Sequence, residues 1–225
     1  MKPYGQFCSI AKALEVIGER WTALILRELI CGSSRFSEIH RGMPRISPSL
    51  LTKRLADLES AGVIRRVEAT NGYELTEAGW ELKPMVETLG IWGQRWVRGQ
   101  LSATDLDPDL LMWDMRRRVN IEVMPENRTC ICFEFTDGPE SSSLYWLVKS
   151  NEGVELCISD PNFDVDLFVT TDVRTMTEVW NGDTQMSEAI DSGQIDLHGP
   201  NTLRTAFPSW LQLNLFAGVK PAEEG

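Results

Sequence analysis

"SPSLLTKRLADLESAGVIRR", residues 47–66, is the stretch that says most about the fold of this chain. Ser47 is a residue type that commonly caps a helix, and Pro48 suits the first helical position. Gly62 is typical of a helix end. The apolar positions recur at helical spacing and form one inward stripe: Leu51, Leu55 and Leu58. The stretch therefore predicts an amphipathic helix that ends before Gly62.

Polar side chains are distributed unevenly along this predicted helix. Its first half carries short polar and basic residues expected on or beside the outer face: Ser49, Thr52, Lys53 and, to one side, Arg54. Its acidic residues, Asp57 and Glu59, lie in the second half. DNA is read by the N-terminal part of a recognition helix, where such side chains meet base edges and phosphates. The order favours DNA contact over an ordinary solvated face.

The segment VIRRVEATNGYELT, residues 63–76, predicts a hairpin. Asn71-Gly72 is a favoured pair for a two-residue turn, and Arg65 and Arg66 add two cations nearby. A helix-turn-helix followed by a basic hairpin is a winged helix. Similar helix packing occurs in proteins that bind no DNA, but the hairpin and the arginine pair favour a DNA-binding domain.

The residues before this stretch predict three helices, within the segments 8–20, 21–32 and 33–44. The helix expected after the hairpin begins with Thr76 as its cap, and Pro84 predicts a kink inside it. Apolar residues recur along it in a heptad-like seam: Leu82, Met85, Leu89, Trp92 and Trp96. The seam packs either on its own domain or on a second chain, and two tryptophans on so small a domain favour a homodimer.

Charge divides the chain into two parts. The formal net charge is -11, yet residues 1–100 hold 14 Lys and Arg against 11 Asp and Glu, a net of +3. Residues 101–225 hold 8 against 22, a net of -14. This asymmetry predicts two domains, 1–100 and 101–225, joined by the polar, turn-rich segment 98–110.

Bulk features predict a cytoplasmic protein that has no membrane partner. The N-terminal segment lacks a signal-peptide pattern, and no window approaches the roughly 20 apolar residues of a membrane span. The five cysteines are odd in number and lack framework spacing, which favours reduced thiols.

The second half predicts an α+β domain. Four strands are expected within the segments 128–135, 143–150, 153–160 and 166–171. Two helices follow, within 173–183 and 184–193, then a short strand at 195–199 and a final amphipathic helix over 200–217.

Motifs from both halves resemble known families. The run from Cys8 to Trp96 contains, in order, ERWTALILREL, RFSEI, ISPSLLTKRLADLESAGVIRR and YELTEAG. This run resembles the HxlR-type winged-helix transcriptional regulators, which are relatives of the MarR group. The resemblance implies a homodimer that reads palindromic double-stranded DNA, with the recognition helix at 47–61 and the wing at 65–73. The candidate DNA-binding residues are Arg35, Ser47, Ser49, Thr52, Lys53, Arg54, Arg65, Arg66 and Asn71.

The segment DVDLFVTTDVRTMTEVWNGDTQMSEAIDSGQIDLHGP, residues 164–200, resembles the sterol carrier protein domain. In that family an apolar cavity between sheet and helices holds a lipid or another apolar ligand. The resemblance implies an apolar small-molecule partner that biases DNA binding. The expected lining residues are Trp113, Trp146, Phe168, Trp180, Met186, Trp210, Leu211 and Phe216.

Enzyme chemistry has little support in the sequence. His40 and His198 are the only histidines, and neither lies in a motif with a nucleophile. Cys130 and Cys132 alternate on a strand and are expected on one face as packed thiols, without the spacing of a zinc site. We therefore expect no catalytic activity, no cofactor and no metal.

Two alternatives to a ligand-responsive regulator remain open. One is a lipid carrier whose winged helix serves assembly alone. The other is a thiol-based regulator, because some HxlR-type proteins sense oxidants through a cysteine near the first helix, and Cys8 matches that position. A thiol at a helix N-terminus has a lowered pKa, which makes it more reactive.

Overall fold

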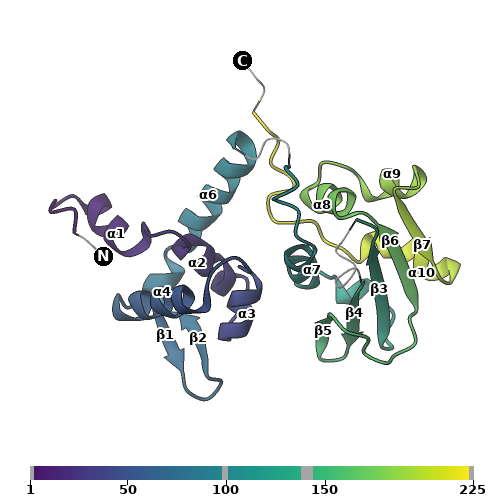
Figure 1. Cartoon of the computed structure of the whole chain (residues 1–225), viewed down its shortest axis with the longest axis horizontal. Helices are drawn as coiled ribbons and strands as arrows, with labels where there is room; N and C mark the ends of the chain where they lie inside the picture. The colour runs from purple at the N-terminus through teal and green to yellow at the C-terminus, as the bar shows by residue number, and fades with distance from the viewer. Residues whose placement is uncertain (1–2, 98–100, 138–143, 223–225) are drawn as a thin grey trace. The chain divides into compact units, whose positions relative to one another are not determined.

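The structure is a computed structural model that describes residues 3–97, 101–137 and 144–222. The chain divides into two compact units, Met1–Gly93 and Gln94–Gly225, which are described separately below (Figure 1). The boundary expected after residue 100 adjoins residues 98–100, which lie outside the described part of the chain, whereas the two units divide between Gly93 and Gln94. Among the described helices, none is long and apolar enough to cross a membrane.

The first unit is a winged helix-turn-helix, as the sequence predicted. Its elements are α1 (Ser9–Ile17), α2 (Thr22–Ile30), α3 (Phe36–Arg41), α4 (Pro48–Ser60), β1 (Ile64–Val67), β2 (Gly72–Leu75), α5 (Glu77–Trp80) and α6 (Lys83–Trp96). The last of these, α6, continues past Gly93, where the unit ends. A single apolar core joins α2, α3, α4 and the hairpin. Its fully buried members include Ile25, Leu26, Ile39, Leu51 and Leu55.

Helix α4 begins and ends where the local sequence predicts. The Ser47 hydroxyl accepts a hydrogen bond from the Leu50 amide at 3.3 Å, and Pro48 occupies the first turn. Gly62 has a φ of +71°, which glycine adopts readily just after a helix. The leucine stripe lies in the core, so the opposite face of α4 is left to solvent.

The turn of the wing differs from the expected two-residue type. Val67 pairs with Gly72, so a longer loop separates β1 from β2, and Gly72 lies inside β2. Gly72 also forms a bridge with Arg35, and a Cβ on Gly72 would lie 3.1 Å from the Ser34 carbonyl oxygen. The close approach of a third backbone segment therefore favours glycine at this position.

The segment after Thr76, predicted to form one helix, forms two helices, α5 and α6. Thr76 caps α5 by accepting a hydrogen bond from the Gly79 amide at 3.2 Å, and α5 ends at Trp80. A new helix, α6, begins at Lys83. Pro84 therefore lies in the first turn of α6, where proline is tolerated, and the predicted mid-helix kink is wrong.

Helix α1 has few contacts with the rest of its unit. Ala11 is its one buried residue, and Figure 1 shows the helix extending away from α2, α3 and α4. The turn that joins it to α2 contains Trp21 at a φ of +80°. A left-handed conformation in a non-glycine residue costs roughly 1–2 kcal/mol, so surrounding contacts must hold this turn.

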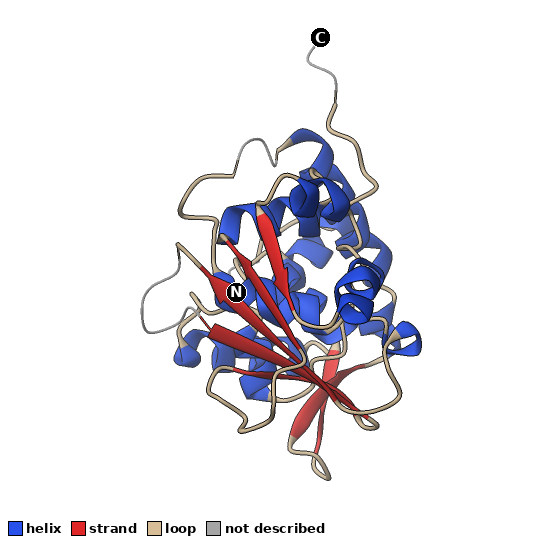
Figure 2. Cartoon of the chain, turned by 90° about the vertical axis from the view of Figure 1, so that its right-hand side faces the viewer, coloured by secondary structure: helices blue, strands red, loops and turns tan. Residues whose placement is uncertain are grey.

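The second unit contains a five-stranded mixed sheet, whose strands are red in Figure 2. The strand order is β5-β4-β3-β6-β7, with β3 parallel to β6 and the other neighbours antiparallel. The strands are β3 (Thr129–Phe135), β4 (Leu144–Ser150), β5 (Gly153–Cys157), β6 (Leu167–Thr171) and β7 (Ile195–His198). The helices are α7 (Pro108–Arg116), α8 (Val173–Asn181), α9 (Met186–Asp191) and α10 (Asn201–Ala206), with 3-10 turns at Ile121–Val123 and Phe207–Ser209.

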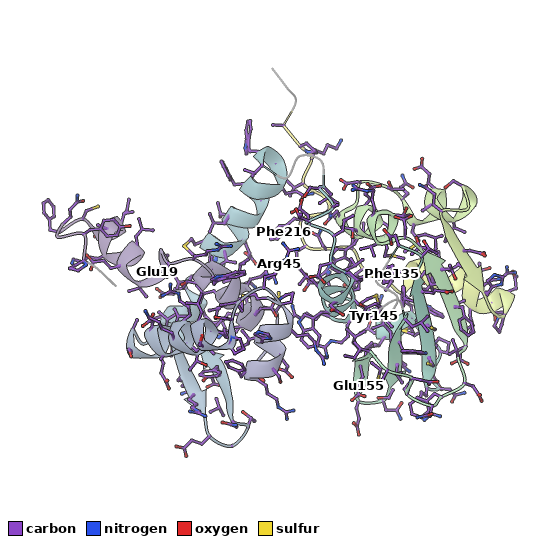
Figure 3. All side chains as sticks on the ribbon, in the orientation of Figure 1. Glu19, Arg45, Phe135, Tyr145, Glu155 and Phe216 are labelled. Atoms are coloured by element: carbon purple, nitrogen blue, oxygen red, sulfur yellow. The ribbon has the colours of Figure 1, made fainter. Side chains whose placement is uncertain are left out.

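One face of this sheet forms the main core of the unit. Phe135 and Tyr145 meet edge-on, with ring centroids 5.7 Å apart, and both are labelled in Figure 3. Phe207 and Trp210 pack into the same core from the C-terminal segment. The Tyr145 hydroxyl donates to the Asp109 carboxylate at 2.8 Å and so ties α7 to β4.

Two features of the second unit differ from expectation. Helix α7 begins within the predicted linker 98–110 and continues beyond it to Arg116; Asp107 caps the helix by accepting a hydrogen bond from the Leu110 amide. The final helix, expected over 200–217, ends at Ala206 and is followed by the 3-10 turn that contains Pro208. Within its described residues, the remaining tail has no further helix; it forms a bridge between Leu211 and Val119 and then a turn at residues 215–218.

Candidate functional site

The N-terminal half of α4 presents a polar, weakly cationic surface. Ser49, Thr52 and Lys53 are exposed, because the leucine stripe turns this side of the helix outward. Ser47 is exposed as well, with its hydroxyl 3.3 Å from that of Ser49. The Thr52 hydroxyl donates to the Pro48 carbonyl at 2.9 Å, while Lys53 has no ion-pair partner within the described residues. This surface suits hydrogen bonding to base edges and phosphates.

Arg54 does not belong to this surface, and its prediction as a DNA contact needs correction. It is 9% exposed and faces the turn between α1 and α2. Its guanidinium donates to the Glu19 carboxylate at 2.7 Å, to the Asp57 carboxylate at 3.2 Å and to the Arg20 carbonyl at 3.3 Å. One residue along a helix rotates the side chain by about 100°, which separates Arg54 from Lys53.

The wing carries its cations on an exposed hairpin. Arg65 forms an ion pair with Glu74 on the opposite strand, and Arg66 donates to the Asn71 side chain at 2.8 Å. Asn71 is exposed at a φ of +49°. Arg35 is also exposed and lies beside the hairpin through its bridge to Gly72. Glu74 offsets the charge of Arg65, so Arg66 and Arg35 carry more of the positive charge at the wing.

His40 has a structural environment near this surface. Its Nε2 atom lies 3.0 Å from the Ile46 carbonyl oxygen, and its ring stacks on Phe36 with an interplanar angle of 7°. These contacts connect α3 to the segment that leads into α4. Two further cations of this region, Arg41 and Arg45, are exposed but are not among the predicted DNA contacts; Arg45 is labelled in Figure 3. Arg41 ends α3 and Arg45 lies between α3 and α4, so their closeness to the recognition helix in the sequence could have identified them.

The apolar seam of α6 is divided between core and surface. Leu82 packs against the core of the first unit, and Met85 is half-buried. Leu89, Trp92 and Trp96 are 51%, 56% and 62% exposed, respectively. Helix α1 and the residues before it add a second set of exposed apolar side chains: Tyr4, Phe7, Ile10 and Leu14. Large exposed apolar surfaces of this kind mark interaction sites.

The residues expected to line one apolar cavity lie in different places. Trp146 and Phe168 project from the sheet face opposite the main core, because each pairs with Cys132 across the strands. Trp180, Trp210 and Leu211 are buried within the main core, and Met186 packs against it. Trp113 is buried beneath the Arg116 guanidinium, which lies 4.1 Å from its ring centroid. Phe216, labelled in Figure 3, is half-buried in the turn at residues 215–218 of the C-terminal tail.

An open groove lies elsewhere in the second unit, between α9, β7 and α10. Its volume is about 380 Å³, and its lining residues include Ile190, Asp191, Leu197, Arg204, Thr205 and Pro208. No periodicity in the sequence marks these positions, since they come from three short elements and the turns between them. Separately, the buried indole N–H of Trp210 has no hydrogen-bond acceptor among the described residues.

The cysteines have contrasting environments. Cys8 is exposed at the N-cap of α1, where the backbone amides of Ala11 and Ile10 lower the pKa of its thiol. Cys130 and Cys132 pack together on one sheet face, as predicted, and burial raises the pKa of each to about 11. Within the described ranges, no group of three His, Cys, Asp or Glu side chains is arranged to hold a metal ion.

Comparison with known proteins identifies relatives of part of the chain. Residues 16–100 match the HxlR-like helix-turn-helix family. YvaP, an uncharacterized HTH-type transcriptional regulator of Bacillus subtilis, is 36% identical over 91 residues, covering 38% of this chain and 84% of YvaP. YtcD of the same organism is 40% identical over 90 residues, covering 38% of this chain and 71% of YtcD. A crystal structure of YtcD covers 39% of this chain and 94% of that chain, at 39% identity and a TM-score of 0.36.

Proposed function

Because the chain belongs to the HxlR-like helix-turn-helix family of transcriptional regulators, we propose that the N-terminal half of α4 reads duplex DNA and that the wing contacts the flanking backbone. The observation that carries this proposal is the outward placement of Ser49, Thr52 and Lys53 on a helix whose inner face is buried. Lys53 is the cation of this surface that is best placed for a base edge or a phosphate.

A lysine substitution tests this proposal. Lys53→Ala should weaken binding to a selected operator by about 1 kcal/mol or more, and it should reduce the slope of log affinity against log salt by roughly 0.9. Lys12→Ala is the matched control, because Lys12 is also exposed but pairs with Glu15 on α1. Fluorescence anisotropy across a salt series measures both quantities. Equal losses for the two variants would contradict a specific contact by Lys53.

The functional species is proposed to be a homodimer. The exposed half of the α6 seam and the apolar residues of α1 support this, since both sets are left to solvent in one chain. A two-fold dimer would present two copies of α4 to successive major grooves of a palindrome, about 34 Å apart.

The second unit is proposed to bind an apolar small molecule that biases DNA binding. The order of strands and helices supports the likeness to a sterol carrier protein domain, although the final helix is shorter than expected. The groove beside α10 is the candidate site for this ligand, because its lining combines apolar side chains such as Ile190 and Leu197 with polar ones such as Thr205. The eight residues predicted to line one apolar cavity lie in different parts of the unit and are not proposed as the ligand site.

Two alternatives make different predictions. A lipid carrier whose winged helix serves assembly alone would show no salt-sensitive binding to duplex DNA. A thiol-based regulator would respond to oxidants through Cys8, an alternative favoured by the exposure and lowered pKa of that thiol.

A further inference from the structure

The turn between α1 and α2 is held by a side chain of the recognition helix. Gly18 ends α1, and a Cβ there would lie 2.6 Å from the Leu14 carbonyl oxygen, so the chain turns tightly. Trp21 then adopts the left-handed conformation described above, immediately before α2. A turn built from a crowded glycine and a left-handed tryptophan needs external contacts to stay in one conformation.

Arg54 supplies those contacts. Its side chain joins the Glu19 carboxylate, the Arg20 carbonyl and the Asp57 carboxylate, and this four-residue arrangement is called the Arg54 clasp. Two of the three contacts reach the α1–α2 turn from α4, while Asp57 belongs to α4 itself. Glu19, labelled in Figure 3, is the one carboxylate that the turn contributes to the clasp.

Because Arg54 is nearly buried, its guanidinium depends on the acceptors of the clasp rather than on water. A guanidinium always carries its charge and presents a rigid fork of donors, so burial is favourable when every branch finds an acceptor. The side chain of Arg54 is 11% exposed, whereas that of Glu19 is 40% exposed. Loss of the Glu19 charge would leave a nearly buried cation with Asp57 as the remaining carboxylate of the clasp, which weakens the connection between the turn and α4.

We infer that Arg54 is a positioning residue that fixes the recognition helix against the α1–α2 turn, so that the orientation of Lys53 depends on Glu19. This inference rests on the proposed function, because it concerns how the same helix meets DNA. It also gives α1, the helix with the exposed apolar residues and Cys8, a direct structural connection to α4. The connection runs through side chains that make no contact with DNA.

Glu19→Gln tests the inference by the sign of its effect. The substitution removes a negative charge near a DNA-binding helix, and simple electrostatics would strengthen DNA binding. Loss of the clasp predicts the reverse, a weakening of about two- to thirtyfold, the range produced by mutations along a coupled network. Glu59→Gln is the matched control, because Glu59 is an exposed acid of α4 outside the clasp. Its affinity should stay unchanged or increase slightly.

Two further measurements separate positioning from direct contact. Arg54→Lys keeps the charge but loses the fork, so it should weaken binding by a similar factor without changing the salt slope. Limited trypsin digestion reports the clasp without DNA. Cleavage after Arg20 should accelerate in Glu19→Gln, while cleavage after Lys12 should keep its wild-type rate, with peptides measured by mass spectrometry.

The possible results lead to distinct conclusions. Tighter binding by Glu19→Gln, matching Glu59→Gln, would overturn the inference. Arg54→Lys with wild-type affinity, or Arg54→Ala with a salt slope reduced by roughly 0.9, would make Arg54 a phosphate contact instead. If the wild-type protein shows no DNA binding, the proposed function fails and the positioning role fails with it. The trypsin result would then decide separately whether the clasp holds the turn.

Discussion

The difference between Lys53 and Arg54 shows how much depends on single positions of a helix. Both are cations of the same turn, and the sequence suggested a DNA contact for each. The leucine stripe sets the inward direction, and Arg54 lies closer to it than Lys53 does. The sequence could predict the stripe, but it could not show that Glu19 would lie within 2.7 Å of Arg54, because that contact joins residues far apart in the chain.

The thiol of Cys8 should react faster than the thiols of the second unit. The thiolate is the reactive form, and the pKa of Cys8 is lowered, whereas those of Cys130 and Cys132 are raised to about 11. At pH 8, iodoacetamide should therefore modify Cys8 first, and the rate should level off at a lower pH than for an unperturbed cysteine. Timed alkylation with peptide mapping measures this order. Native protein that labels Cys130 or Cys132 as fast as Cys8 would contradict it, and Cys8→Ser supplies the blank.

At the scale of elements, the helices and strands with strong apolar periodicity could be predicted from the sequence, whereas the positions where helices end could not. The buried stripe of α4, the strands of the second unit and the two helices after β6 follow from patterns of local sequence. Close to the end of α5, Gly79 packs against distant backbone, where a Cβ would lie 2.2 Å from the Val63 carbonyl oxygen. The tail after Ser209 is held by hydrogen bonds to distant backbone, including that from the Asn214 amide to the Trp180 carbonyl. Neither contact leaves a local pattern.

The exposed half of α6 should hold two chains together. Leu89→Glu with Trp92→Glu places two charges on the exposed part of the seam, where desolvation in a dimer would be costly. The double variant should sediment as a monomer and bind the operator more weakly, with an unchanged circular dichroism spectrum. Glu87→Lys reverses a charge on the side of α6 opposite the seam, where the side chain is 45% exposed, and this variant should remain dimeric. A double variant that sediments like the wild type would exclude this seam.

For the whole molecule, the charge asymmetry accompanies two units with separate cores. The first unit holds α4 and the wing, and the second holds most of the acidic residues around a mixed sheet. The sequence indicated both units and their general classes. It did not locate the groove or the distribution of tryptophans over two sheet faces, because strand pairing decides which face each side chain occupies.

A ligand of the second unit should change intrinsic tryptophan fluorescence and should bind with a different affinity when operator is present. A tenfold difference corresponds to a coupling free energy of about 1.4 kcal/mol. Titrations with fatty acids, sterols and hydrophobic drugs, with and without operator, measure this. Thr205→Trp fills the exposed rim of the groove and should abolish binding without unfolding the unit. Equal affinity in both titrations would make the molecule cargo, and unimpaired binding by Thr205→Trp would place the site outside the groove.

Footprinting on an operator selected from genomic DNA, with dimethyl sulfate to probe guanine N7 in the major groove and hydroxyl radicals to probe the sugar backbone, tests the central claim, that two copies of α4 read duplex DNA, most directly. The wild-type chain should protect two major-groove segments related by two-fold symmetry and centred about 34 Å apart, roughly one helical turn. Lys53→Ala should lose protection within these segments before it loses the flanking protection given by the wing. Salt-insensitive binding with no discrete footprint, or protection of a single asymmetric segment, would contradict the account.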